Sequence, residues 1–310
     1  MAVTAPPVQQ RHKRSKINLT PYFFLIAPLL LYLTWIIIPM AYTFYLSLTD
    51  WDGVSPEAKY IGLKNFDSLF GSLGKTRPSP FQWALTNNLK WLLTFITVPV
   101  GIGLGLAMIL NRDVRGDRFF KMGIFLPQVL ALPIIALIWS YGVYNPRVGV
   151  LNSLLTSLGM ADPPGWLADK NLAIWAVIAA AAWRQVGYIM ILYVAGLKNM
   201  DPTLLDAAKV DGASGWKSFW YVVFPLLAPI TTIVVVISII DSLRSFDMVW
   251  VMTRGGPFNS SNVLAVLMYI QSFNDYRMGL GAATAVVLFF ISLVFIIAYL
   301  TRVMKDELEY

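Results

Sequence analysis

The sequence contains no cysteine and a single histidine, His12, among its 310 residues. Without thiols, disulfides and cysteine nucleophiles are excluded, and one histidine in a basic N-terminal stretch leaves no His-based metal site and no Ser-His-Asp triad. Charged residues are also scarce, at 13% of the chain, whereas hydrophobic residues make up 57%. A soluble domain carries about a quarter charged residues. The composition therefore predicts a membrane protein that is not itself an enzyme and holds no metal.

Six apolar stretches are each long enough to cross a hydrocarbon core of about 30 Å, which takes roughly 20 helical residues. They are 22–48, 88–111, 119–145, 171–197, 222–247 and 279–303. Several contain proline, which membrane helices tolerate because neighbouring helices satisfy the freed carbonyl groups. We therefore predict an all-α polytopic membrane protein with six transmembrane helices. The first stretch is too long for a signal peptide and no small-residue cleavage site follows it, so we expect it to be retained.

Lysine and arginine are more frequent in the connecting segments that lie inside if the N-terminus is cytoplasmic. This bias predicts that both termini are cytoplasmic. We divide the chain into a disordered basic tail (1–16), a first helix with an extracytoplasmic loop (17–83), a transmembrane domain (84–305) and a C-terminal tail (306–310). The net charge of +7 then reflects topology and some affinity for anionic membrane lipid, and no nucleic-acid partner is expected.

The stretch GSLGKT at 71–76 resembles the end of a phosphate-binding loop, G-x-x-x-x-G-K-T. The first glycine of that pattern falls on Leu69, and no buried strand precedes the stretch. We therefore predict that this chain does not bind ATP by itself and carries no cofactor.

A charged, small-residue segment, DAAKVDGASGWKSF at 206–219, separates two of the long apolar runs. Upstream of it, Asp201 followed by Pro202 is typical of a helix start, and Gly212 interrupts the helix that follows. The segment 198–221 is thus predicted to form two short helices joined at a glycine bend in the cytoplasm. The alternative is an amphipathic loop that rests on the membrane surface.

This segment resembles the EAA motif, E-A-A-x3-G-x9-I-x-L-P, of binding-protein-dependent ABC importer permeases. The motif reads here as Asp206-Ala207-Ala208, then Gly212, then Val222-Val223-Phe224-Pro225, with the spacing intact and mild departures of Asp for Glu, Val for Ile and Phe for Leu. The resemblance implies the type I ABC importer permease fold, in which this loop is a coupling helix that docks into a cleft on a separate ATPase subunit. The coupling residues it implies are Asp206, Ala207, Ala208, Asp211, Gly212, Ala213 and Pro225.

The loop Thr253-x-Gly255-Gly256-Pro257 and the start of the last span, Gly279–Ala285, are similar to the carbohydrate-uptake branch, which includes maltose and glycerol-3-phosphate permeases. That likeness implies a bacterial or archaeal plasma membrane (the inner membrane) and a sugar, oligosaccharide or glycoside as solute. It also implies a second homologous permease subunit, two ATP-binding subunits that hold ATP and Mg, and an extracytoplasmic solute-binding protein. The alternatives are an importer for glycerol-3-phosphate or another polar anion, an energy-independent channel or secondary transporter, and a structural or signalling subunit.

Polar residues form one stripe on each of the fourth and fifth spans, and such intramembrane residues are costly and usually functional. By helical spacing, Arg184, Gln185 and Tyr188 share a face with Ala181, and Ser238, Asp241, Ser242 and Ser245 follow the i, i+3, i+4, i+7 pattern. We expect these eight residues to bind solute, with Arg184 and Asp241 able to pair across the pathway. The resemblance supports this, because the matching stretches line the sugar site of maltose-type permeases. The alternative is that Arg184 and Asp241 only hold the bundle together and the serines bond to their own helix.

Overall fold

The computed structural model describes residues 20–75, 77–111 and 116–308. It consists of two units, residues 1–43 and 44–310, and α2 crosses the boundary between them. The predicted basic tail 1–16, and the last two residues of the predicted C-terminal tail, lie outside the described residues. The second unit contains both the predicted solute-binding stripes and the segment 198–221.

The described residues are helical throughout, apart from loops and one isolated bridge between Thr49 and Tyr60. In chain order the elements are α1 (Thr20–Tyr32), η1 (Leu33–Ile37), α2 (Ile38–Leu46), α3 (Lys64–Phe70), α4 (Pro80–Leu110), α5 (Asp117–Val129), α6 (Leu132–Leu137), η2 (Ile138–Val143), α7 (Val150–Ser157), α8 (Ala173–Lys198), α9 (Pro202–Val210), α10 (Gly215–Ser218), η3 (Phe219–Val223), α11 (Phe224–Leu226), α12 (Ala228–Leu243), α13 (Asp247–Met252), α14 (Leu264–Tyr269), η4 (Ile270–Asn274) and α15 (Met278–Leu308), where η marks a π-helical turn.

Four of the six predicted spans are continuous apolar helices of sufficient length, at Phe23–Leu46, Pro80–Leu110, Ala173–Lys198 and Met278–Thr301. The third and fifth spans are each a bent pair of helices. Asp117–Val129 meets Leu132–Val143 at 100°, and Gly215–Leu226 meets Ala228–Leu243 at 69°. The prediction of an all-α membrane protein is confirmed, with the difference that two spans are broken.

Both breaks lie beside prolines. At the first, Leu130 and Ala131 are extended, with ψ of 142° and 141°, and Pro133 occupies the first turn of α6. At the second, Pro225 and Pro229 flank Leu227, where α11 ends and α12 begins. Proline lacks the N–H that would continue the helical ladder and its ring clashes with the preceding turn, so each apolar run divides at these points.

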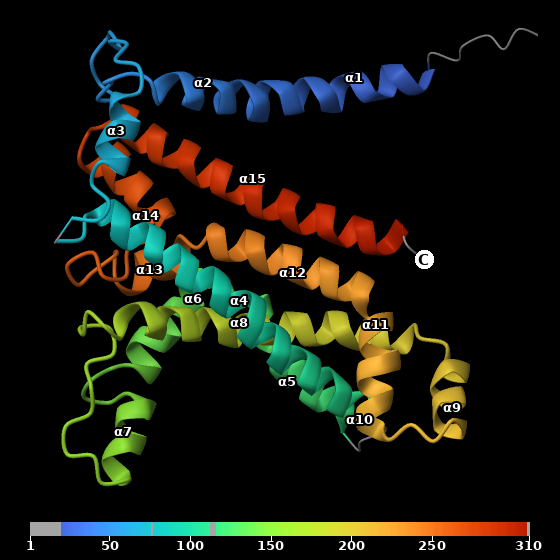
Figure 1. Ribbon diagram of the computed structural model, residues 1–310. Helices are drawn as coiled ribbons and strands as arrows, with labels where there is room; N and C mark the ends of the chain where they lie inside the picture. Colours follow the sequence, from blue (N-terminus) through green and yellow to red (C-terminus); the bar gives the residue numbers. More distant parts are fainter. Residues whose placement is uncertain (1–19, 76, 112–115, 309–310) are drawn as a thin grey trace, which may run out of the picture. The chain divides into compact units, whose positions relative to one another are not determined.

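The second unit is built around α8, which packs closely on α4 and α5 (Figure 1). Glycine permits this approach at Gly187, where an added Cβ would lie 2.2 Å from the backbone oxygen of Ile124 on α5. Helices that approach so closely use small residues at the contact. The fourth span is thereby fixed between two neighbours, and its polar residues have defined positions.

The helices of the second unit place its connecting segments at two opposite ends (Figure 1). The short helices α9 and α10 lie at one end, beyond the C-terminus of α8. The helices α3 and α7 and the loop between α13 and α14 lie at the other end. The segment 198–221 and these long loops are therefore separated by the length of the membrane helices.

Candidate functional site: a charged cavity and a helical coupling loop

The segment 198–221, for which a coupling role is predicted, contains a capped helix. Asp201 is the N-cap of α9, its Oδ1 accepts a hydrogen bond of 2.9 Å from the backbone N–H of Thr203, and Pro202 is the first helical residue. Hydrogen bonds from the backbone and the side chain of Thr203 hold the pKa of the Asp201 carboxyl below its usual value. The predicted helix start is therefore confirmed.

The same helix ends at Val210, and Gly212, two residues later, has a φ of +75°. The N–H of Ala213 donates to the carbonyl of Ala208 at 3.0 Å, and the N–H of Gly212 donates to the carbonyl of Lys209 at 3.1 Å. This pair of bonds is the Schellman arrangement, in which a left-handed residue closes the helix. The chain then turns sharply and starts α10 at a second cap, Ser214.

The helix α9 presents a mixed face to its surroundings. Asp206 and Lys209 form an exposed ion pair of 2.8 Å one turn apart, and Val210 is 88% exposed. Ala208 points the other way and is buried. A short helix with one buried alanine and an exposed apolar and charged side has a free surface that a partner protein can contact.

An aromatic group lies at the start of the fifth span, directly after this loop. Its members are Trp216, Phe219, Trp220 and Phe224, whose neighbouring ring centroids lie 5.0 to 6.2 Å apart. Aromatic pairs at this spacing stabilise beyond their buried area. Pro225 follows directly in α11, so the aromatic group lies within the first arm of the bent fifth span, Gly215–Leu226.

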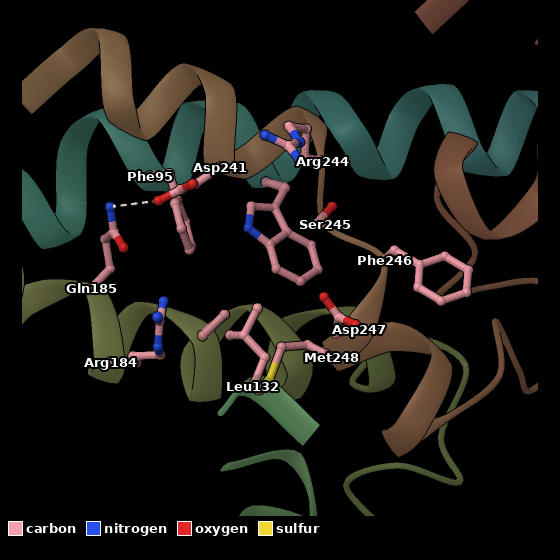
Figure 2. Close-up of a pocket in the computed structure, with 12 residues that line it drawn as sticks. Phe95, Leu132, Arg184, Gln185, Asp241, Arg244, Ser245, Phe246, Asp247 and Met248 are labelled. Carbon is pink, nitrogen blue, oxygen red and sulfur yellow. Dashed lines mark hydrogen bonds between the residues drawn. The ribbon is translucent and has the colours of Figure 1, made fainter. Parts of the chain in front are cut away.

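A cavity of about 260 Å³ lies between α4, α8 and α12 (Figure 2). Its polar lining comes from both predicted stripes and from the residues after α12. The lining residues are Trp91, Phe95, Leu132, Ala181, Arg184, Gln185, Asp241, Arg244, Ser245, Phe246, Asp247 and Met248. Five of the eight predicted residues are thus brought together: Ala181, Arg184, Gln185, Asp241 and Ser245.

The charges in the cavity are paired differently from the expectation. The side-chain amide of Gln185 donates to Asp241 Oδ2 at 3.2 Å. Among the described residues, ion pairs join Lys121 with Asp117 and Lys209 with Asp206, and the pair of Arg184 with Asp241 is not formed. Figure 2 shows Arg184 pointing into the cavity from the α8 side.

Two donors in the cavity wall lack partners among the described groups. They are Nε of Arg184 and Nε1 of Trp91, each shielded from solvent. A buried donor without an acceptor costs about 1–3 kcal/mol, so both gain if a polar molecule enters and accepts from them. Asp241 and Arg244 are exposed in the single chain and add an acceptor and a further donor. The cavity therefore suits a solute with many hydroxyl or acidic oxygens.

Three predicted residues do not line the cavity. Ser242 is fully buried and its hydroxyl donates to the carbonyl of Ile239 on its own helix. Ser238 is also fully buried, and Tyr188 is half-buried on α8. For Ser242 the alternative interpretation, that the serine bonds to its own helix, describes the structure.

Sequence reasoning missed other cavity residues, among them the aromatic residues Trp91 and Phe95. They lie one turn apart on α4, in a long apolar run that gives no sign of a polar neighbour. Arg244 and Asp247 also line the cavity, and their charge in an apolar span is the signal by which they could have been found. They fall where a continuous helix was expected, although α12 ends at Leu243 and the chain restarts as α13 at Asp247.

No group of three or more His, Cys, Asp or Glu side chains that could hold a metal ion occurs in the part of the chain that the structure describes. The donor set of the cavity is one of guanidinium, amide and separate carboxylate groups. It fits an organic polar solute.

The chain is similar to known transport proteins in sequence and in fold. Residues 97–308 match the family described as binding-protein-dependent transport system inner membrane component. The chain is 35% identical over 291 residues to a probable ABC transporter permease protein of Pyrococcus horikoshii, covering 93% of this chain and 97% of that one. It is 30% identical over 289 residues to a probable starch degradation products transport system permease protein of Thermoanaerobacterium thermosulfurigenes, covering 93% and 95%. A solved bacterial alginate ABC transporter, in complex with an alginate pentasaccharide-bound periplasmic protein, matches in fold with a TM-score of 0.77 and 20% identity, covering 90% of this chain and 92% of that one.

Proposed function

Since this chain belongs to the family of binding-protein-dependent transport system inner membrane components, we propose that it is the permease subunit of an ABC importer that carries a sugar, oligosaccharide or glycoside. The observation that carries the proposal is the charged cavity between α4, α8 and α12. A starch-product permease among its relatives supports the same class of solute.

The cavity offers the groups by which proteins hold hydroxyl-rich solutes. Asp241 and Gln185 present an acceptor and a donor 3.2 Å apart, a spacing that suits two neighbouring hydroxyl groups. The indole of Trp91 and the ring of Phe95 supply an apolar face for the carbon side of a sugar ring. Arg184 and Trp91 each supply a donor that has no other partner. Bound solute would satisfy all four polar groups together.

Asp241 and Arg244 are exposed in the single chain although they lie at the end of an otherwise apolar helix. Both line the cavity, and charged groups within a membrane usually face the interior of a helix bundle or a water-filled space. A second homologous permease subunit, facing this one across the cavity, is the partner we propose. The solute pathway would then be shared between the two subunits.

We assign energy coupling to the segment around α9. Its Schellman turn and its aromatic connection to Pro225 make a stiff lever with an exposed face. Two ATP-binding subunits would hold ATP and Mg and dock on Asp206, Ala207, Asp211 and Ala213, with Gly212 fixing the turn and Ala208 packing beneath. Movement of that lever would shift the fifth span, which carries Asp241 into the cavity.

An extracytoplasmic solute-binding protein would deliver solute at the end of the molecule opposite α9, in a bacterial or archaeal plasma membrane, with both termini cytoplasmic. Residues 17–83 would form the first helix and its outer loop, and residues 84–305 the transporting domain, between the tails 1–16 and 306–310.

A polar anion such as glycerol-3-phosphate is the second candidate solute. It is favoured by Nε of Arg184, which has no acceptor among the described groups, and by the nearby Arg244. A phosphate accepts well from guanidinium groups. Asp241 and Asp247 in the same cavity oppose it by charge.

Uptake by the reconstituted complex tests the pocket. We expect Asp241→Asn to lower the uptake of a labelled oligosaccharide about tenfold or more, because the amide replaces an acceptor by a donor beside Gln185. Ser242→Ala is the matched control, because Ser242 follows Asp241 on the helix and its hydroxyl bonds only within its own turn. Uptake by this variant should stay within about twofold of wild type. Equal uptake by Asp241→Asn and Ser242→Ala would remove Asp241 from the solute site, and competition by glycerol-3-phosphate but not by oligosaccharide would favour the anion.

A further inference from the structure

The loop between α13 and α14 holds one large aromatic side chain out of the molecule. Phe258 is 89% exposed and has a φ of +52°. Its neighbours Arg254 and Asn259 also have positive φ, at 51° and 64°. A bulky residue rarely adopts this left-handed conformation, and strained positions of this kind cluster at functional sites.

The exposure of Phe258 is a property of an ordered loop, because the loop is bonded internally on both sides of the ring. Ser260, Ser261 and Asn262 are at most 1% exposed. The N–H of Ser260 donates to the carbonyl of Pro257 at 2.9 Å, and the Ser261 hydroxyl donates to the carbonyl of Gly256. The ring is therefore held outward by a fixed backbone.

The loop is also fastened to the helix that forms one wall of the cavity. The side-chain amide of Asn87 on α4 donates to the carbonyls of Ser260 and Asn262, at 2.7 and 2.9 Å. Asn88 Oδ1 accepts from the N–H of Leu264 at 2.8 Å. One turn further along α4, Trp91 lines the cavity. The loop is therefore fastened by buried hydrogen bonds to the part of α4 that lies next to the cavity.

We propose that Phe258 is the aromatic anchor by which this subunit binds the extracytoplasmic solute-binding protein, with Asn87 and Asn88 as positioning residues that fasten its loop to α4. The inference rests on the proposed function. The proposed function includes a solute-binding protein, and the inference names one residue of this chain that contacts it.

Three observations favour a protein as the occupant. Phe258 lies in the loop at the end of the second unit opposite α9 (Figure 1), the end at which solute arrives under the proposed function. Aromatic side chains, phenylalanine among them, are enriched in protein interfaces relative to the rest of the surface. The chain around the ring is polar, with Asn259 beside it and an exposed Arg254 close by in the sequence, whereas a side chain that dips into lipid is expected among apolar neighbours.

The experiment measures binding of the solute-binding protein encoded beside the permease genes to the assembled complex in nanodiscs. The variant is Phe258→Asn, because asparagine adopts positive φ more readily than phenylalanine and so preserves the loop while removing the ring. Tyr60→Ala is the matched control, since Tyr60 is another exposed aromatic in the loop that follows the first span. Phe258→Tyr retains an aromatic ring and tests rescue.

We expect Phe258→Asn to raise the dissociation constant about tenfold or more. The dissociation constants of Tyr60→Ala and Phe258→Tyr should stay within about threefold of wild type. Unchanged binding by Phe258→Asn would overturn the inference, as would an equal loss in Tyr60→Ala. A lower yield of reconstituted complex with unchanged affinity would identify a lipid contact and also overturn it. Absence of binding by the wild-type complex would instead contradict the proposed function itself.

Discussion

Gly212 allows the coupling turn to be tested by conformation alone. Its φ of +75° lies in the left-handed region, and an added Cβ would meet nothing within 4 Å. A substitution here therefore causes no collision and acts only through the backbone. The left-handed conformation costs an ordinary residue about 1–2 kcal/mol, which shifts the equilibrium away from the native turn by a factor of about 5–30. Asparagine tolerates this region better and should cost less.

The assay is retention of the ATP-binding subunits on tagged permease, together with solute-stimulated ATPase turnover. We expect both to fall several-fold in Gly212→Ala and to take an intermediate value in Gly212→Asn. Gly215→Ala is the matched control, because Gly215 lies three residues away, also has open space around it and has no positive φ. The reasoning would be refuted if Gly212→Ala behaved like Gly215→Ala, or if Gly212→Asn were impaired as strongly as Gly212→Ala.

Two further predictions concern stability. Asn87→Ala leaves the buried carbonyls of Ser260 and Asn262 without their side-chain donor and should lower the free energy of unfolding by about 1–3 kcal/mol. The loss is measured as a lower midpoint in tryptophan-detected thermal unfolding, and an unchanged midpoint would show that these two bonds do not hold the loop. Gly187→Ala places a Cβ against the backbone oxygen of Ile124 and should lower the midpoint through an overpacking cost of about 1–3 kcal/mol, whereas Gly123→Ala on the facing helix, with nothing within 4 Å, should not; equal midpoints for the two variants would argue against a close α5–α8 contact.

Hydropathy and motif spacing were sufficient for most of the fold. The predicted stretches 88–111, 171–197 and 279–303 correspond to α4, α8 and α15, because a run of about 20 apolar residues has few other stable arrangements. The helix start at Asp201 and the turn at Gly212 were also predictable, since each rests on a local hydrogen-bonding rule.

The breaks in the third and fifth spans were not predictable by the same reasoning. Proline in a membrane helix produces a kink in one context and a separate helix in another, and tertiary packing decides between them. Pro99 lies inside the continuous helix α4, whereas Pro133 begins a new helix after a 100° bend. Both prolines are visible in the sequence, but the sequence does not show which of them interrupts its helix.

The candidate site was predicted where polar residues stood out and missed where the surroundings decide. Asp241 and Arg184 are conspicuous in apolar spans, and both line the cavity. Ser238 and Ser242 fit the same helical stripe but are fully buried, because helical spacing does not fix how far a face turns toward a cavity. Trp91 was missed because an aromatic residue in an apolar span is usually packing.

The central claim is that this subunit moves solute only when a separate ATPase acts on it. The most direct measurement is uptake of a labelled oligosaccharide into proteoliposomes that contain this permease, its partner permease, the ATP-binding subunits and the solute-binding protein. We predict uptake against a gradient that requires ATP and the solute-binding protein together. Uptake that proceeds down the gradient at the same rate without ATP would identify a channel or secondary transporter and contradict the account.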